Sequence, residues 1–238
     1  MNNEIQTIQK LLEKHNYIEA EKQAALLTNR FPKNSGSFQA LGICQMSQYK
    51  DTQAIESFQK GLKIDPNDFG LNHNISLVYF RNDLIKKALT HNQKSIESSP
   101  EHPLPYLSRG MINMKKRLFQ EAQNDFEDAI NIFGGFNNTN DNLLKTQYME
   151  SLIANNQEEK IIEIYQQLKS QDKFDPDVFY LLASNKPDFF QQDEIEKILK
   201  LKNQNFQNSH EKVNVLSSIY FGIGKIYEKK KDTEFENI

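Results

Sequence analysis

Residues 37–68 read SFQALGICQMSQYKDTQAIESFQKGLKIDPND, and the spacing of small residues and proline in this stretch recurs along the chain. Alanines repeat every 34 residues, at Ala20, Ala54, Ala88 and Ala122. Prolines follow the same step, at Pro32, Pro66 and Pro100, with Gly134 at the next place. Two residue types that share one period indicate a structural repeat of 34 residues.

The period divides the first part of the chain into four units, residues 1–34, 35–68, 69–102 and 103–136. Each unit is predicted to hold two helices of about 14 residues, joined by a short turn. The proline near the end of a unit cannot continue a helix and therefore closes it. Small side chains, such as Gly42, Gly110 and the repeated alanines, recur where two helices must approach closely.

These positions resemble the signature of the tetratricopeptide-repeat family. In the quoted unit the matching residues are Phe38, Leu41, Gly42, Ala54, Phe58, Gly61 and Pro66. The fourth unit, YLSRGMINMKKRLFQEAQNDFEDAI at 106–130, is similar, and the resemblance covers at least 1–136. Positions are counted from 1 to 34 within each unit, so that they equal the residue numbers in the first unit. The departures from the signature are the missing tryptophan at position 4, Gln45 and Asn113 at position 11, and Asp51 at position 17. The resemblance implies an all-α fold, a right-handed α-solenoid of stacked antiparallel helix hairpins.

Residues 137–238 are predicted to form a diverged helical extension similar to tetratricopeptide repeats (TPR). The turn-forming stretch GGFNNTNDN at 134–142 breaks the 34-residue register. Beyond it, apolar residues at spacings of three and four predict a fifth helix pair at 141–155 and 157–170. This pair is displaced by about five residues from the register of the first four units.

The end of the chain is predicted to hold three further helices. Proline positions favour a short helix near 177–184 and a longer one near 188–202. The last helix, at 210–231, has no partner helix after it, so we expect it to be unpaired with an uncovered apolar face. Such a face favours self-association or contact with a downstream domain.

The C-terminal third, residues 176–238, resembles the region that precedes the catalytic domain of bacterial TPR sulfotransferases. The stretch that carries this resemblance most directly is SSIYFGIGKIYEKKKDTEFENI at 217–238. The resemblance implies an alternative function, as the N-terminal substrate-recognition part or remnant of such an enzyme. A phosphosulfate-binding loop is absent from this chain, so the catalytic domain itself is not expected here.

Composition excludes several classes of function. A formal net charge of -3 and a pI near 6.0 argue against nucleic acid as a partner, because a basic surface normally supplies that affinity. No run approaches 18 apolar residues, which argues against membrane insertion. The single cysteine, Cys44, excludes an internal disulfide, and the absence of a signal peptide at the start favours a cytoplasmic protein.

No constellation of residues points to catalysis or to a cofactor. The FGIGK sequence at 221–225 lacks the glycine and the hydroxyl residue that a phosphate loop requires, so small residues for helix contact are expected there. The five histidines show no metal-ligand spacing, and Cys44 is expected to be a packed, inert thiol. We therefore expect a non-enzyme without a cofactor or a metal.

The family resemblance implies a partner-binding surface on the concave side, lined by positions 2, 5, 9, 12 and 13 of the first helices. The candidate residues are Gln39, Ile43, Met46, His73, Leu77, Phe80, Arg81, Leu107, Met111, Met114 and Lys115. Ser47 and Leu104 occupy the same positions. The set is apolar at its centre with basic residues at its edge, which suits a peptide or protein segment.

Two alternatives bear on this surface. Ile43, Leu77 and Leu107 can instead serve only in packing between helices. Relatives that hold the acidic tails of heat-shock chaperones use a set of lysine, arginine and asparagine residues that these positions lack, so chaperone-tail binding is disfavoured. The leading prediction is a non-catalytic protein-protein interaction scaffold.

Overall fold

The computed structural model describes residues 2–139, 141–171, 173–201 and 209–236. These residues form thirteen α-helices and two short 3-10 turns, and this part of the chain contains no β-strand. The all-α fold class predicted from the repeat is therefore confirmed. The chain divides into two compact units, residues 1–133 and 134–238, which are described separately below.

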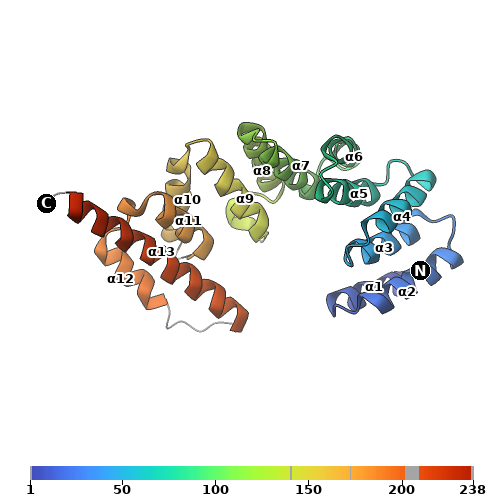
Figure 1. Ribbon diagram of the computed structural model, residues 1–238, viewed down its shortest axis with the longest axis horizontal. Helices are drawn as coiled ribbons and strands as arrows, with labels where there is room; N and C mark the ends of the chain where they lie inside the picture. Colours follow the sequence, from blue (N-terminus) through green and yellow to red (C-terminus); the bar gives the residue numbers. More distant parts are fainter. Residues whose placement is uncertain (1, 140, 172, 202–208, 237–238) are drawn as a thin grey trace. The chain divides into compact units, whose positions relative to one another are not determined.

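The first unit consists of four helix hairpins in sequence order (Figure 1). Its helices are α1 (Asn2–Glu13), α2 (Tyr17–Arg30), α3 (Ser35–Met46), α4 (Asp51–Ile64), α5 (Phe69–Arg81), α6 (Ile85–Ser98), α7 (Pro103–Lys115) and α8 (Phe119–Ile132). Within each hairpin the two helices pack together, and each second helix also packs on the first helix of the next hairpin. The first helices α1, α3, α5 and α7 also contact one another in order, so they form one continuous layer.

The turn inside each hairpin has the same backbone conformation. His15, Tyr49, Asp83 and Arg117 have φ values of 56° to 61° and follow one another at 34-residue steps. In the second hairpin, Tyr49 N donates to Met46 O at 3.1 Å and Lys50 N donates to Gln45 O at 3.0 Å. These bonds satisfy the free carbonyl groups at the end of α3, which is how a left-handed residue terminates a helix.

A fifth turn of this kind lies in the second unit at Asn156, with a φ of 56°. It follows Arg117 by 39 residues, five more than the repeat. The five-residue displacement predicted after the 134–142 stretch is therefore present in the structure. Gly134 and Gly135 in that stretch have φ values of 81° and 112°, which glycine adopts without strain.

The core between the two helices of a hairpin is built from residue pairs whose sizes compensate. Gly42 faces Phe58 and Gly110 faces Phe126, and in each case a Cβ on the glycine would lie 2.3 Å from the ring Cε1. Both phenylalanines are fully buried, as are the repeated alanines. In the third hairpin, the corresponding places are taken by two buried polar residues, Ser76 and Asn92. A large residue at position 24 thus requires the smallest one at position 8.

Leucine in place of Gly42 is expected to lower the free energy of unfolding of the first unit by about 1 to 3 kcal/mol, because the larger side chain collides with the Phe58 ring. The measurement is urea denaturation followed by circular dichroism. The control is Gly224→Ala in a helix of the second unit, where an added Cβ has no atom within 4 Å. That change is expected to stabilise its own unit by about 0.5 to 1 kcal/mol. Equal losses in both variants would contradict the packing described here.

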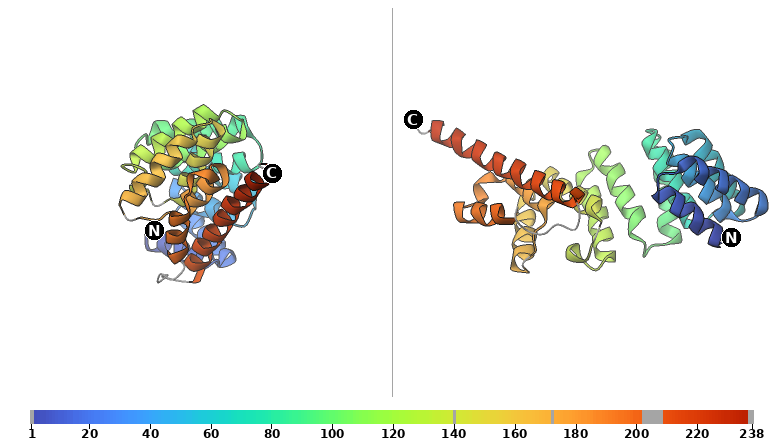
Figure 2. Two further views of the ribbon diagram at one scale, coloured as in Figure 1. Left: turned by 90° about the vertical axis from the view of Figure 1, so that its left-hand side faces the viewer. Right: turned by 90° about the horizontal axis from the view of Figure 1, so that it is seen from below.

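The second unit contains helices α9 (Asn142–Ala154), α10 (Glu158–Ser170), α11 (Pro176–Asn185), α12 (Gln192–Lys200) and α13 (Ser209–Glu236), with 3-10 turns at Phe136–Asn138 and Pro187–Phe189. The α9 and α10 bounds match the fifth pair expected from the sequence within a few residues. Two views from other directions show α13 as one long helix at the end of the chain (Figure 2).

The prediction of one longer helix near 188–202 is wrong. The structure has a 3-10 turn at Pro187–Phe189, extended backbone at Phe190, and an α-helix only from Gln192. The physical reason is burial of Phe190, whose ring lies edge-on to Phe179 and to Tyr165 at centroid distances of 5.2 and 5.5 Å. Burying this aromatic ring outweighs the local preference for a continuous helix. Residue 202, the predicted end, lies outside the described residues.

The prediction of an unpaired final helix also requires correction. Helix α13 packs on α11 within the second unit, and its buried face consists of Val215, Ile219, Ile223 and Ile226. Gly222 permits the close approach, since a Cβ there would lie 2.6 Å from Cε1 of Phe179 on α11. The inner apolar face is therefore covered by α11, an earlier helix of the same unit. Association of residues 210–231 with a second copy or a further domain stays a prediction.

Candidate functional site: the first-helix layer of the first unit

All eleven candidate partner-binding residues lie on α3, α5 and α7, which belong to the layer of first helices. Their exposure differs widely along this layer. His73 and Leu107 retain only 8% and 6% of their accessible surface, so they can offer little to a partner. Arg81 and Lys115 are exposed, and the remaining members are half-buried: Gln39, Ile43, Met46, Leu77, Phe80, Met111 and Met114.

The half-buried apolar residues pack against the core and also keep exposed surface. Ile43, Met46 and Phe80 pack against the buried cluster that contains Phe58, Ile75 and Ile112. Each of the three also keeps part of its surface free. The burial of Leu107 matches the packing alternative for that residue, whereas Leu77 lines a pocket.

A pocket of about 300 Å³ opens where the C-terminal ends of α3 and α5 lie side by side. It is lined by Met46, Ser47, Tyr49, Leu77 and Arg81. Four of these residues occupy positions that the sequence pattern assigned to the concave surface. Tyr49 was missed, because it belongs to the turn rather than to a helix. Tyr49 has a left-handed backbone conformation in this turn. The sequence alone does not show where its ring lies.

Arg81 forms one wall of this pocket and is held by several groups. Its Nε donates to Oδ2 of Asp51 at 3.1 Å, and its Nη2 donates to the other oxygen of that carboxylate. Nη2 also donates to the carbonyl oxygen of Met46 at 3.2 Å. The guanidinium lies over the Tyr49 ring, 4.9 Å from its centroid, in a cation-π arrangement. The arginine thus bridges the second and third hairpins.

Lys115 lies at the corresponding place on α7. Its Nζ is 2.8 Å from Oδ1 of Asp83 and 5.5 Å from the centre of the Phe80 ring. Both partners of the Lys115–Asp83 ion pair are exposed, so solvent and salt weaken the pair. Arg81 and Lys115 therefore each lie beside an aromatic ring and an aspartate of the same unit.

Among the candidate residues, His73 has a buried environment, unlike that of a binding surface. Its ring is buried and stacks parallel to Phe69 at a centroid distance of 6.1 Å, and its Nδ1 has no hydrogen-bond partner. Burial, together with the nearby His102, lowers the pKa of His73 to about 4. The imidazole is therefore neutral at physiological pH and belongs to the packing between helices.

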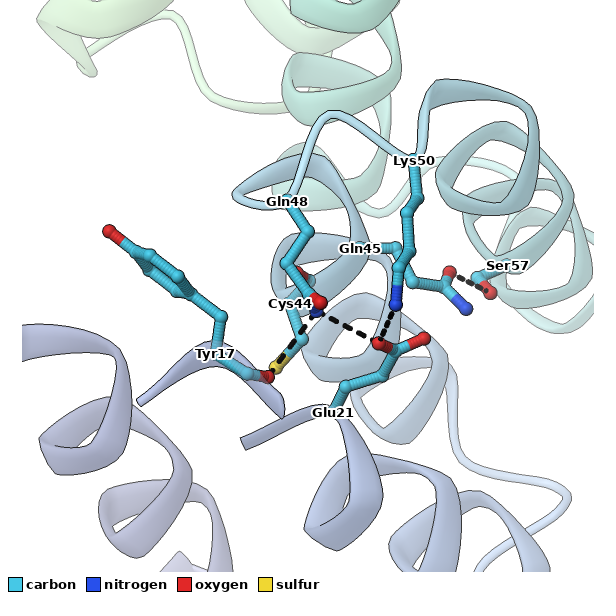
Figure 3. Close-up of polar contacts among 7 residues, drawn as sticks. All are labelled: Tyr17, Glu21, Cys44, Gln45, Gln48, Lys50 and Ser57. Atoms are coloured by element: carbon cyan, nitrogen blue, oxygen red, sulfur yellow. Dashed lines mark hydrogen bonds and ion pairs between the residues drawn. The ribbon is translucent and has the colours of Figure 1, made fainter. Parts of the chain in front are cut away.

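Cys44 lies beside a cluster of polar side chains from α2, α3 and the turn that follows α3 (Figure 3). Burial, more than the nearby Glu21 charge, raises the pKa of the Cys44 thiol to about 12, so the thiolate is not available as a nucleophile. Glu21 accepts hydrogen bonds from Gln48 at 2.8 Å and from Lys50 at 2.6 Å. Burial opposes ionisation of Glu21, but these hydrogen bonds outweigh it and lower its pKa.

The same contacts have a structural effect. Gln48 Nε2 also donates to the carbonyl oxygens of Tyr17 and Cys44 at 3.3 and 3.0 Å (Figure 3). Glu21 on α2 therefore holds the 47–50 turn against the first hairpin from one side. That turn carries Tyr49, so the cluster supports a wall of the pocket.

In the described part of the chain, no three histidine, cysteine, aspartate or glutamate side chains gather as a set that could hold a metal ion. None of the helices in the same residues has the length and the apolar character needed to cross a membrane.

Comparisons with known proteins address the fold. No protein-family model and no curated protein matches this chain. Among solved structures, PilF from Pseudomonas aeruginosa superposes with a TM-score of 0.66 at 16% identity, covering 91% of this chain and 96% of that one. The chain has a tetratricopeptide-repeat fold. Identity this low shows the fold of the TPR solenoid and nothing about its partners.

Two other solved TPR structures agree with this assignment. The APC/C hetero-tetramer Cut9-Hcn1 gives a TM-score of 0.63 at 16% identity, and the match covers 94% of this chain but 42% of that chain. MamA from Desulfovibrio magneticus RS-1 gives 0.57 at 13% identity, with 72% of this chain and 94% of that one covered. The predicted resemblance to TPR proteins is thus confirmed at the level of the fold.

Proposed function

We propose that this protein is a non-catalytic scaffold that binds a segment of another protein on the first-helix layer of its first unit. The observation that carries the proposal is the pocket between α3 and α5, whose apolar lining includes Met46 and Leu77. Half-buried methionines and aromatic residues continue along the layer to α7, and such side chains adapt to apolar partners. The division into repeat units 1–34, 35–68, 69–102 and 103–136 remains part of this proposal.

The test is a selection of peptides from a random display library on the full-length protein, followed by affinity measurement with the recovered peptides. Phe80→Ala and Met111→Glu are expected to weaken binding at least about tenfold, the effect of losing roughly 1.4 kcal/mol. Helicity of both variants is expected to stay near that of the wild type, since each side chain is only partly buried.

Ile64→Glu is the matched control, because it also places a charge on a partly exposed apolar position, but on the second helix α4. Its affinity for the recovered peptides is expected to equal that of the wild type. Recovery of no peptide, or of peptides whose binding survives Phe80→Ala and Met111→Glu, would refute the proposal. Loss of helicity in either variant would show that these residues belong to the core.

The alternative function, substrate recognition for a sulfotransferase-type enzyme, rests on the resemblance of residues 176–238 and stays a prediction. It requires a sulfotransferase catalytic domain acting together with this chain. Sequencing the adjoining reading frame tests that requirement directly. A sulfotransferase domain with a phosphosulfate loop there would support the alternative, and an unrelated frame would count against it.

A further inference from the structure

Both cationic candidate residues of the first-helix layer, Arg81 and Lys115, are already paired with aspartates of the same unit. The two pairs differ in how firmly they are built. The Lys115–Asp83 contact is a single pair between exposed side chains. The Arg81–Asp51 contact is bidentate and less exposed, so it sets the electrostatic character of the pocket.

Asp51 is held in place by three hydrogen bonds from two residues. Two of its contacts come from Arg81, and a third comes from Asn82, whose Nδ2 donates to Oδ2 of Asp51 at 2.5 Å. Asp51 is also the first residue of α4, where the free N–H groups of the helix favour a negative charge. The aspartate is therefore held in position when the pocket is empty.

Arg81 has little freedom to turn toward a ligand. It would have to leave the Asp51 carboxylate, the Met46 carbonyl and the face of Tyr49 together. An acidic side chain that enters the pocket finds Nε and Nη2 of Arg81 occupied by Asp51, so it must either displace that carboxylate or bind Nη1 against the repulsion of the Asp51 charge. An uncharged apolar side chain needs no such exchange, because it gains contact with Met46 and Leu77 while Arg81 keeps its partners.

We propose that Asp51 is a specificity-determining residue that makes this pocket select uncharged, apolar segments and reject acidic ones. The inference rests on the proposed function and names the chemistry of the segment that the pocket binds. A buried or partly buried counter-charge is an effective way to disfavour a wrong ligand, because the wrong ligand must replace it. Removing the counter-charge while keeping its shape should release the guanidinium.

The experiment repeats the peptide selection in parallel on the full-length wild type, on Asp51→Asn and on the control Glu56→Gln. Glu56 is exposed on the same helix, so its replacement removes the same charge outside the pocket. Wild type and Glu56→Gln are expected to recover uncharged apolar peptides. Their affinity should change less than about twofold between roughly 50 and 500 mM NaCl, since no net charge is neutralised on binding.

Asp51→Asn is expected to recover peptides with acidic residues beside the apolar ones. Their affinity should fall about tenfold over the same salt range, because an exposed guanidinium-carboxylate contact is screened by salt. Circular dichroism and the urea midpoint check that the variant is folded, as expected for an isosteric change at a helix start. Leu77→Glu is measured with every peptide to show that binding occurs in the pocket.

The outcomes separate this inference from the proposed function. Recovery of acidic peptides that bind the wild type in a salt-dependent way and no longer bind Leu77→Glu would overturn the inference but leave the pocket as a binding site. The same peptides from Asp51→Asn as from the wild type would also overturn it. Peptides recovered on the wild type that bind equally well to Leu77→Glu would overturn the inference, because they do not occupy the pocket. If their binding also survives Phe80→Ala and Met111→Glu, the proposed function is refuted as well.

Discussion

Replacing Phe58 by alanine is expected to lower the free energy of unfolding of the first unit by about 3 to 5 kcal/mol. The ring is fully buried in the cluster that also contains Leu71, Ile75 and Val78, and it fills the space left by Gly42. Removing it leaves a cavity that neighbours in α3 and α5 cannot fill without moving backbone. Urea denaturation of the full chain, followed by circular dichroism, measures the loss.

The control for Phe58→Ala is Ile18→Ala, since Ile18 is 80% exposed on α2 and is expected to change stability by less than about 0.5 kcal/mol. Native-state hydrogen exchange adds a local readout, with faster exchange expected first in α3, α4 and α5. A loss below about 1 kcal/mol for Phe58→Ala would mean that the two helices of the hairpin collapse onto each other. The glycine would then have no role in accommodating the ring.

Acid is expected to destabilise the first unit through His73, by an amount on the order of 3 kcal/mol at pH 4. The pKa of this imidazole in the folded protein is about 4, whereas its ordinary value is 6.5. Between these two pH values, the unfolded chain binds a proton at His73 that the folded protein does not bind. Unfolding is therefore favoured progressively as the pH falls from about 6.5, and this contribution is fully developed near pH 4.

His73→Phe isolates this contribution, because phenylalanine keeps a ring against Phe69 and removes both the titration and the unpaired Nδ1. The measurement is the unfolding free energy of variant and wild type in urea at several pH values between 7 and 4. The advantage of the variant is expected to grow by about 3 kcal/mol over this range, while other titrating groups act on both proteins alike. A difference that stays constant with pH would show that the pKa of His73 is the same in the folded and the unfolded protein.

The hairpin architecture could be predicted from the sequence because it depends on local and periodic features. The alanines at 34-residue steps and the prolines at the ends of units define where helices approach and where they end. Ala54 and Ala88 are indeed fully buried. The pairing of glycine with phenylalanine at Gly42 and Phe58 is also visible in the sequence once the period is known.

The binding surface could be predicted only in part. The repeat positions placed Met46, Leu77 and Arg81 on the right helices, and these residues line the pocket. The same rule also selected His73 and Leu107, which neighbouring helices bury. Burial depends on what the next hairpin brings into contact, and a position number within one unit does not contain that information.

The helix pairs of this protein, their period and the five-residue shift after the fourth pair could be predicted from the sequence. Each is read from apolar spacings of three and four residues or from their recurrence along the chain. Tertiary structure alone decided three features: the ion pair of Arg81 with Asp51, the extended backbone at Phe190 and the covering of α13 by α11. Their physical reason is common to all three. Each depends on contacts between residues about 11 to more than 30 positions apart, whose energies exceed local preferences only once the chain has folded.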